Sequence, residues 1–89
     1  MNIGLIPTLD LCIESTARRE YLKSTDEYMR KGQKDRKLEE KIELLRMFLE
    51  TVDFRKLRAD SEKHLIEGKN VRFILTLVKG NPEYEMKVG

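Results

Sequence analysis

The strongest constraint on the fold of this 89-residue chain is a run of alternating apolar residues between positions 71 and 88. Apolar side chains recur at every second position on both sides of a turn-forming segment, Lys79 to Pro82: Val71, Phe73, Leu75 and Leu77 come before it, and Tyr84, Met86 and Val88 come after it. Successive residues of a β-strand point to opposite faces, so this spacing predicts a β-hairpin with one apolar face. Because a two-stranded ribbon is only marginally stable in water, the hairpin needs helices on one face and further contacts elsewhere.

The turn segment also predicts how the two strands pair. Pro82 has no backbone N–H group, so the second strand should begin after it. Pairing across the turn then places Val78 opposite Glu83, which carries three apolar pairs into the core: Leu77 with Tyr84, Leu75 with Met86, and Phe73 with Val88.

The opposite face of the first strand is only partly polar, because Ile74 and Val78 lie there beside Thr76. We therefore take Ile74, Thr76 and Val78 as a candidate interface. If residues 71–78 form an edge strand, no inward-pointing charge blocks further pairing. Two copies could join at that edge in a four-stranded antiparallel sheet, or residues 2–6 could add as a third strand of the same chain.

Helical periodicity dominates the chain between these two regions. Pro7 and Thr8 predict the start of a first helix that runs to about Lys31, although residues 9–13 also alternate like a short strand. The segment Ser24 to Glu27 resembles a capping box that could begin a new helix. However, three pairs of opposite charge at i and i+4 favour one continuous helix: Glu14 with Arg18, Asp26 with Arg30, and Glu27 with Lys31.

Two further helices follow, each with an aspartate as its predicted N-cap. Asp35 precedes a stripe of apolar residues that ends at Val52, and the apolar arc widens between Leu44 and Phe48. Asp53 precedes a shorter stripe that stops at Gly68. The fold class predicted is α+β, in a single small domain over residues 1–89. A helical hairpin and a third short helix pack on one face of a C-terminal antiparallel β-hairpin, in the order α-α-α-β-β.

Composition excludes several classes of protein. A single cysteine, Cys12, permits no intramolecular disulfide and suits a reducing cytoplasm. The apolar runs are too short for a membrane span, and the first residues lack the basic flank of a signal peptide. Charged residues make up 38% of the chain while asparagine and glutamine are few, a balance that resembles a thermophile's protein.

Two groups of basic residues make a nucleic-acid partner conceivable. The first lies at the predicted tip of the helical hairpin and the second at the start of the third helix: Arg30, Lys31, Lys34, Arg36 and Lys37, then Arg55, Lys56 and Arg58. If the fold brings the groups together, they could bind phosphates. The net charge is only +2, and no aromatic residues lie among these lysines and arginines. A solvated surface is therefore the favoured interpretation.

Catalytic chemistry has little support in this sequence. His64 is the only histidine, with Asp60 and Glu67 at helical spacing, and it is interpreted as a solvated side chain in the last turn of a helix. Cys12 has no base or cation in its own turn and is interpreted as buried filler. The carboxylates on the helices lack the repeated spacing of a metal site, so we predict no metal and no cofactor.

The function predicted is therefore a non-enzymatic protein-interaction module that forms a homodimer through its C-terminal strands or a helix surface. A weak nucleic-acid-binding protein is the alternative, and an enzyme centred on Asp60 and His64 ranks third.

Overall fold

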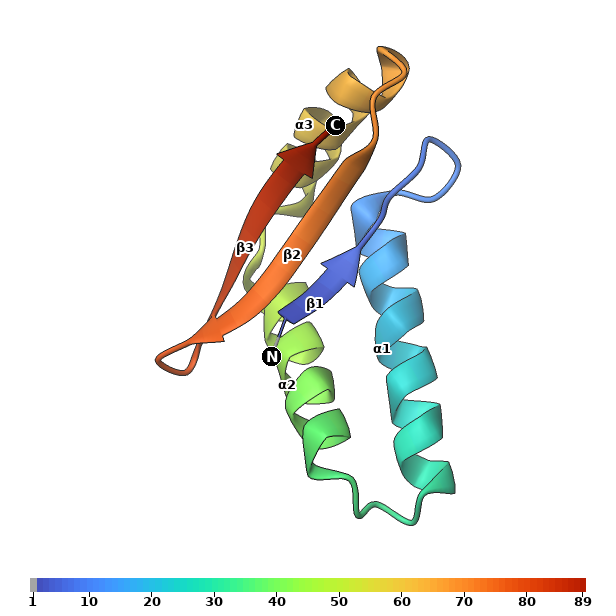
Figure 1. Ribbon diagram of the computed structural model, residues 1–89, viewed down its shortest axis with the longest axis vertical. Coiled ribbons are helices and arrows are strands. Elements are labelled where there is room, and N and C mark those ends of the chain that lie inside the picture. Colours follow the sequence, from blue (N-terminus) through green and yellow to red (C-terminus); the bar gives the residue numbers. More distant parts are fainter. Residues whose placement is uncertain (1) are drawn as a thin grey trace.

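The computed structural model describes residues 2–89, which form three helices and a three-stranded sheet (Figure 1). In chain order the elements are β1 (Asn2–Leu5), α1 (Ile13–Arg30), α2 (Arg36–Thr51), α3 (Phe54–Ile66), β2 (Val71–Val78) and β3 (Asn81–Val88). The α+β class is confirmed, and a first strand precedes the three helices.

The sheet has the order β1-β2-β3, with both pairings antiparallel. Strand β1 pairs with the middle of β2, from Asn2 opposite Thr76 to Leu5 opposite Phe73. Of the two arrangements left open by the sequence, the third strand within the chain is therefore the one observed. The four-stranded sheet between two copies at residues 71–78 is wrong, because β2 is the central strand and β1 already pairs with it from Phe73 to Thr76.

The pairing of β2 with β3 differs by two residues from the predicted register. Leu75 lies opposite Tyr84, Phe73 opposite Met86 and Leu77 opposite Pro82, so β3 already includes Pro82. The reason is a turn of only two residues, Lys79 and Gly80, whose φ angles of 51° and 80° fit a tight hairpin turn. Proline is tolerated because β3 is an edge strand. A shift of two residues changes the partners but keeps every side chain on its face.

The first helix begins later than predicted. Thr8 does not start it, because its backbone N–H and side-chain oxygen close a turn with Leu11, at 2.9 and 3.0 Å. Helix α1 begins at Ile13 and runs unbroken through the capping-box sequence to Arg30. The three predicted i,i+4 ion pairs are all present along this helix, which confirms the continuous interpretation.

Helices α2 and α3 begin where their aspartates predict. The Asp35 carboxylate accepts a hydrogen bond from the Leu38 backbone N–H at 3.2 Å. The Asp53 carboxylate accepts from the backbone N–H groups of Arg55 and Lys56, at 3.1 and 3.4 Å. Each carboxylate satisfies donors that the first turn of a helix leaves without a partner.

In Figure 1, α3 and the upper end of α2 lie behind the sheet, and α1 lies side by side with α2 as an antiparallel hairpin. The core between the layers is apolar, and its members come from every element except β3: Ile3, Leu5, Ile13, Ala17, Leu44, Leu45, Phe48, Leu57, Val71, Phe73 and Leu75. From the predicted inner face of the ribbon, Leu77, Tyr84 and Val88 are instead 41%, 42% and 39% exposed. The helices therefore cover the β1 and β2 side of the sheet better than the β3 side.

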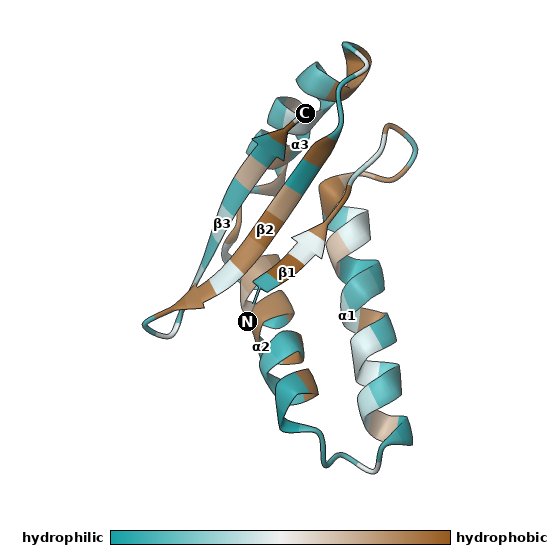
Figure 2. Ribbon diagram, viewed as in Figure 1, coloured by the Kyte–Doolittle hydropathy of each residue, from teal (hydrophilic) through white to brown (hydrophobic). Residues whose placement is uncertain are grey.

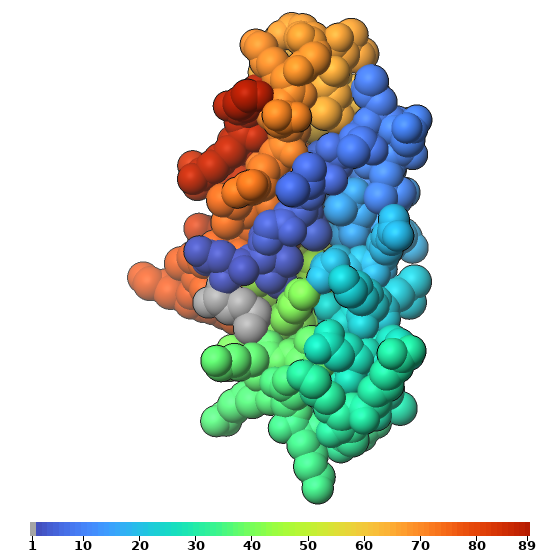
Figure 3. All heavy atoms as spheres, turned by 45° about the vertical axis from the view of Figure 1, so that its right-hand side comes forward, coloured from blue at the N-terminus to red at the C-terminus, as the bar shows by residue number. Residues whose placement is uncertain are grey.

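The far half of the helical hairpin extends beyond the sheet, as the space-filling view shows at its lower end (Figure 3). Contacts between α1 and α2 hold its two legs together. Leu38 and Ser24 are buried, and the Lys41 ammonium donates to the Glu20 carboxylate at 2.6 Å across the two helices.

Candidate interaction surface

One face of the sheet carries no helix among residues 2–89, and we call it the open sheet face. It points toward the viewer in Figure 2. Alternation along the strands defines its side chains: Asn2 and Gly4 from β1, Arg72, Ile74, Thr76 and Val78 from β2, and Glu83, Glu85 and Lys87 from β3.

Ile74 lies at the centre of the open sheet face. Its cross-strand neighbours are Gly4 on β1 and Glu85 on β3. Since Gly4 has no side chain and nothing lies within 4 Å of the space a Cβ would occupy, the β1 side of Ile74 is open. A hollow of about 290 Å³ follows this gap between Ile74 and Ile6. A second, of about 220 Å³, lies between Ile74 and Val78.

The charges of this face are sorted by sign. Arg72 and Lys87 are direct cross-strand partners at one end. Glu83 and Glu85 lie two residues apart on β3, level with Thr76 and Ile74. All four side chains are exposed, and none of them makes an ion pair with any of residues 2–89. The face is thus neutral in sum but has one basic end and one acidic end.

The structure places the three predicted interface residues together on this surface. Ile74 and Thr76 are half-buried and Val78 is 37% exposed. Sequence reasoning did not take Arg72 as a residue of this face. The signal was available, because Arg72 has the same parity as Ile74.

The wide apolar arc of the second helix offers no comparable surface. Leu44, Leu45 and Phe48 are at most 1% exposed, because the sheet and the other helices cover them from several sides. The prediction that this arc is buried on more than one side is confirmed. The arc is used within the chain, which removes the reason for a dimer through the helices.

The basic residues at the hairpin tip are partly neutralised by neighbouring acids. Arg30 pairs with Asp26 at 2.9 Å, and Lys31 lies 3.4 Å from Glu27 and 3.1 Å from Asp35. The other three bases of this group have no ion pair with any of residues 2–89: Lys34, Arg36 and Lys37.

The second basic group is remote from the tip. Arg55, Lys56 and Arg58 lie in α3, which follows the opposite end of α2, and the 16 residues of α2 separate the two groups by about 24 Å. Arg58 also pairs with Glu62 at 2.8 Å. The fold therefore does not create the joint phosphate-binding patch on which the nucleic-acid interpretation depended.

His64 shows no catalytic arrangement. It is half-buried and forms no ion pair with Asp60 among residues 2–89. Neither side chain lines the hollows on the open sheet face or the one beside Cys12. His64 Nδ1 is buried without a hydrogen-bond partner in the described residues.

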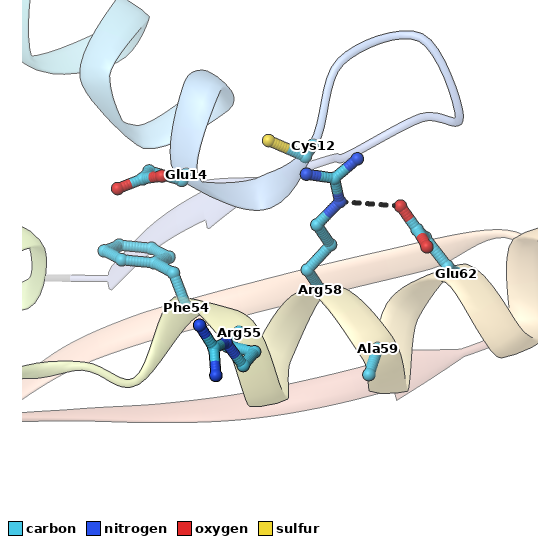
Figure 4. A pocket seen from close by; sticks show the side chains of 7 residues that line it. All are labelled: Cys12, Glu14, Phe54, Arg55, Arg58, Ala59 and Glu62. Carbon is cyan, nitrogen blue, oxygen red and sulfur yellow. Dashed lines mark hydrogen bonds and ion pairs between the residues drawn. The ribbon is translucent and has the colours of Figure 1, made fainter.

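Cys12 is the N-cap residue of α1 and borders a hollow of about 380 Å³ (Figure 4). The hollow lies between the start of α1 and α3: its lining is Cys12, Glu14, Phe54, Arg55, Arg58, Ala59 and Glu62. The thiol lies 3.3 Å from the Ser15 hydroxyl. This hydrogen bond, with help from the Ser15 backbone N–H and the charge of Arg58, lowers the pKa of the Cys12 thiol. Cys12 is half-buried and not fully buried as expected, and the cation near it, Arg58, belongs to α3 and not to its own turn.

Two classes of site have no structural support in the described residues. No group of three or more histidine, cysteine, aspartate or glutamate side chains within residues 2–89 is placed to hold a metal ion. In the same part of the chain, every helix is too short or too polar to cross a membrane.

A protein-family model matches residues 1–85, a range that reaches from before β1 well into β3. The match carries no activity, ligand or partner across to the chain. No curated protein and no solved structure matches it.

Proposed function

The chain belongs to the family whose model matches its residues 1–85, and we propose that it is a non-enzymatic protein-interaction module that forms a homodimer through the open sheet face. The observation that carries the proposal is Ile74, a large apolar side chain at the centre of a sheet face without a helix over it. Val78 adds apolar area, and the hollows beside Ile74 leave room for side chains of a partner.

The edges of the sheet are poor alternatives for association. Strand β1 offers only 4 residues. Strand β3 is longer, but Pro82 lacks an N–H donor, and three charged residues follow within the strand: Glu83, Glu85 and Lys87. Short strands, proline and charges are the usual features that prevent edge-to-edge pairing. The face of the sheet is therefore favoured over its edges.

Sedimentation equilibrium over a range of concentrations tests the proposal. We expect the wild-type chain to form dimers at tens of micromolar. The variant Ile74→Asp should be monomeric there, because burying an unpaired carboxylate opposes association. A wild-type chain that stays monomeric at this concentration overturns the proposal.

The matched control is Leu22→Asp. Leu22 is an exposed apolar residue on α1, 65% exposed, so it receives the same change in chemistry away from the sheet. We expect this variant to dimerise like the wild type. If both variants lose the dimer, or neither does, Ile74 does not lie in the interface. Circular dichroism of each variant shows whether its fold is intact.

We further propose a cytoplasmic location and a thermophilic source. The free thiol of Cys12 supports the first. The second is supported by the charged composition and the i,i+4 ion pairs on the helices. A melting temperature in the mesophilic range, about 45–65 °C, would contradict a thermophilic source.

A further inference from the structure

We infer that the partner on the open sheet face is a second copy held in one orientation, in which the basic end of each copy lies over the acidic end of the other. The inference rests on the proposed function and adds the geometry of the complex. The two sheets pack face to face about a two-fold axis that crosses β2 near Ile74, perpendicular to the strand.

The charge pattern within one chain is unfavourable. Arg72 and Lys87 lie directly opposite each other on neighbouring strands, and like charges in that position repel. Glu83 and Glu85 share one face of one strand, about 7 Å apart. Other charged residues of this chain, such as Arg46 between Glu43 and Glu50, have partners of opposite sign. The four charges of the open sheet face lack such partners in their own chain.

A second copy supplies those partners only in one of the two simple orientations. An axis perpendicular to β2 reverses the strand direction but keeps each strand over the same strand of the other copy. Lys87 of each copy therefore lies over Glu83 and Glu85 on β3 of the other, while Arg72 lies over β2 next to them. An axis parallel to β2 keeps the direction and places Arg72 over Arg72 of the second copy. Because the contact is isologous, the favourable pairing occurs twice in the first case and the repulsion is not relieved in the second.

The size of the face makes orientation by charge important. A central strand of 8 residues and three strands side by side span about 27 by 14 Å. This footprint is at the small end of specific interfaces, so the contact around Ile74 supplies only weak affinity. Electrostatic complementarity then selects the orientation of the two copies.

Two charge variants, each studied alone, test the orientation, and their mixture tests whether charge controls the association. The variant R72E/K87E carries an entirely acidic face, and E83K/E85K carries an entirely basic one. We expect each variant alone to associate at least about tenfold more weakly than the wild type, since the facing of position 87 with positions 83 and 85 becomes repulsive. An equimolar mixture should form a heterodimer at least as tight as the wild-type homodimer. This association should weaken several-fold when NaCl is raised from about 0.05 to 0.5 M.

The outcomes separate this inference from the proposed function. If the wild type dimerises and Ile74→Asp abolishes the dimer, but neither charge variant alone dimerises more weakly than the wild type, then the face is the interface and the inferred orientation is wrong. If the wild type is monomeric, the proposed homodimer and its inferred orientation are both wrong. An unknown second protein or a small anion as the true occupant of the face would give the latter result.

A measurement on the wild-type chain keeps the orientation testable if a charge variant does not fold. A carbodiimide couples a lysine amine directly to a carboxylate only when the two groups are in contact. In dimers mixed from ¹⁴N- and ¹⁵N-labelled chains, we expect cross-links from Lys87 of one copy to Glu83 or Glu85 of the other. Lys87→Arg keeps the charge but cannot be coupled, and it should abolish them. Inter-chain cross-links that omit these residues overturn the inference.

Discussion

Replacing Leu45 by alanine tests the central packing of the fold. Leu45 is 0% exposed and lies in α2, where it belongs to the core between the helices and the sheet. The change removes three carbon groups, worth about 0.8 kcal/mol each in transfer from water, so the hydrophobic loss is about 2.4 kcal/mol. The cavity left behind adds to this, and the expected total is about 2–5 kcal/mol.

The measurement is urea unfolding followed by circular dichroism, with the free energy of unfolding compared at one protein concentration because dimerisation stabilises the folded chain. Leu22→Ala is the matched control, since the same change on an exposed position of a helix should cost less than about 0.5 kcal/mol. The urea dependence should stay constant in both variants. A Leu45→Ala loss no greater than that of the control would mean that the helix faces are assigned wrongly.

Two further predictions concern the starts of helices. Asp53→Ala should lower the free energy of unfolding by about 0.5–2 kcal/mol, measured by the same urea unfolding, because α3 loses the carboxylate that accepts from its first backbone N–H groups. An unchanged stability would show that the cap is dispensable. Ser15→Ala should raise the pKa of the Cys12 thiol, since the hydroxyl bond is the largest cause of its lowered value. The pH profile of alkylation by iodoacetamide should then shift to higher pH, and an identical profile in both proteins would contradict this.

The starts of helices could be predicted from the sequence where a capping side chain marks them. Asp35 and Asp53 cap α2 and α3 as their positions suggest. The start of α1 was not predictable in this way, because its N-cap is Cys12, and cysteine is not among the residues preferred at that position. Thr8, the residue that resembled a cap, closes a turn with Leu11 instead. Local signals of this kind show which residues favour a turn, but not whether a helix continues from it.

The third strand was left open by the sequence for a physical reason. Strand β1 has 4 residues and one of them is Gly4, so its intrinsic preference for a strand is weak. What makes it a strand is the free edge of β2, which is far away in the sequence. The same tertiary effect explains the core, because Ile3 and Leu5 are buried there at 5% and 2% exposure.

Two features of the open sheet face depend on the sequence in different ways. The alternation along a strand determines which apolar residues lie on the face, whereas the register between strands determines how its charges are arranged. A shift of two residues leaves Ile74, Thr76 and Val78 on the same face, so the interface residues could be predicted despite the wrong turn. The charge pattern could not, because the predicted register places Arg72 opposite Gly89 and Lys87 opposite Ile74. Only the two-residue turn at Lys79 and Gly80 brings the two bases together. The charge pattern of the open sheet face therefore depends on this short turn, whereas the position of its apolar residues does not.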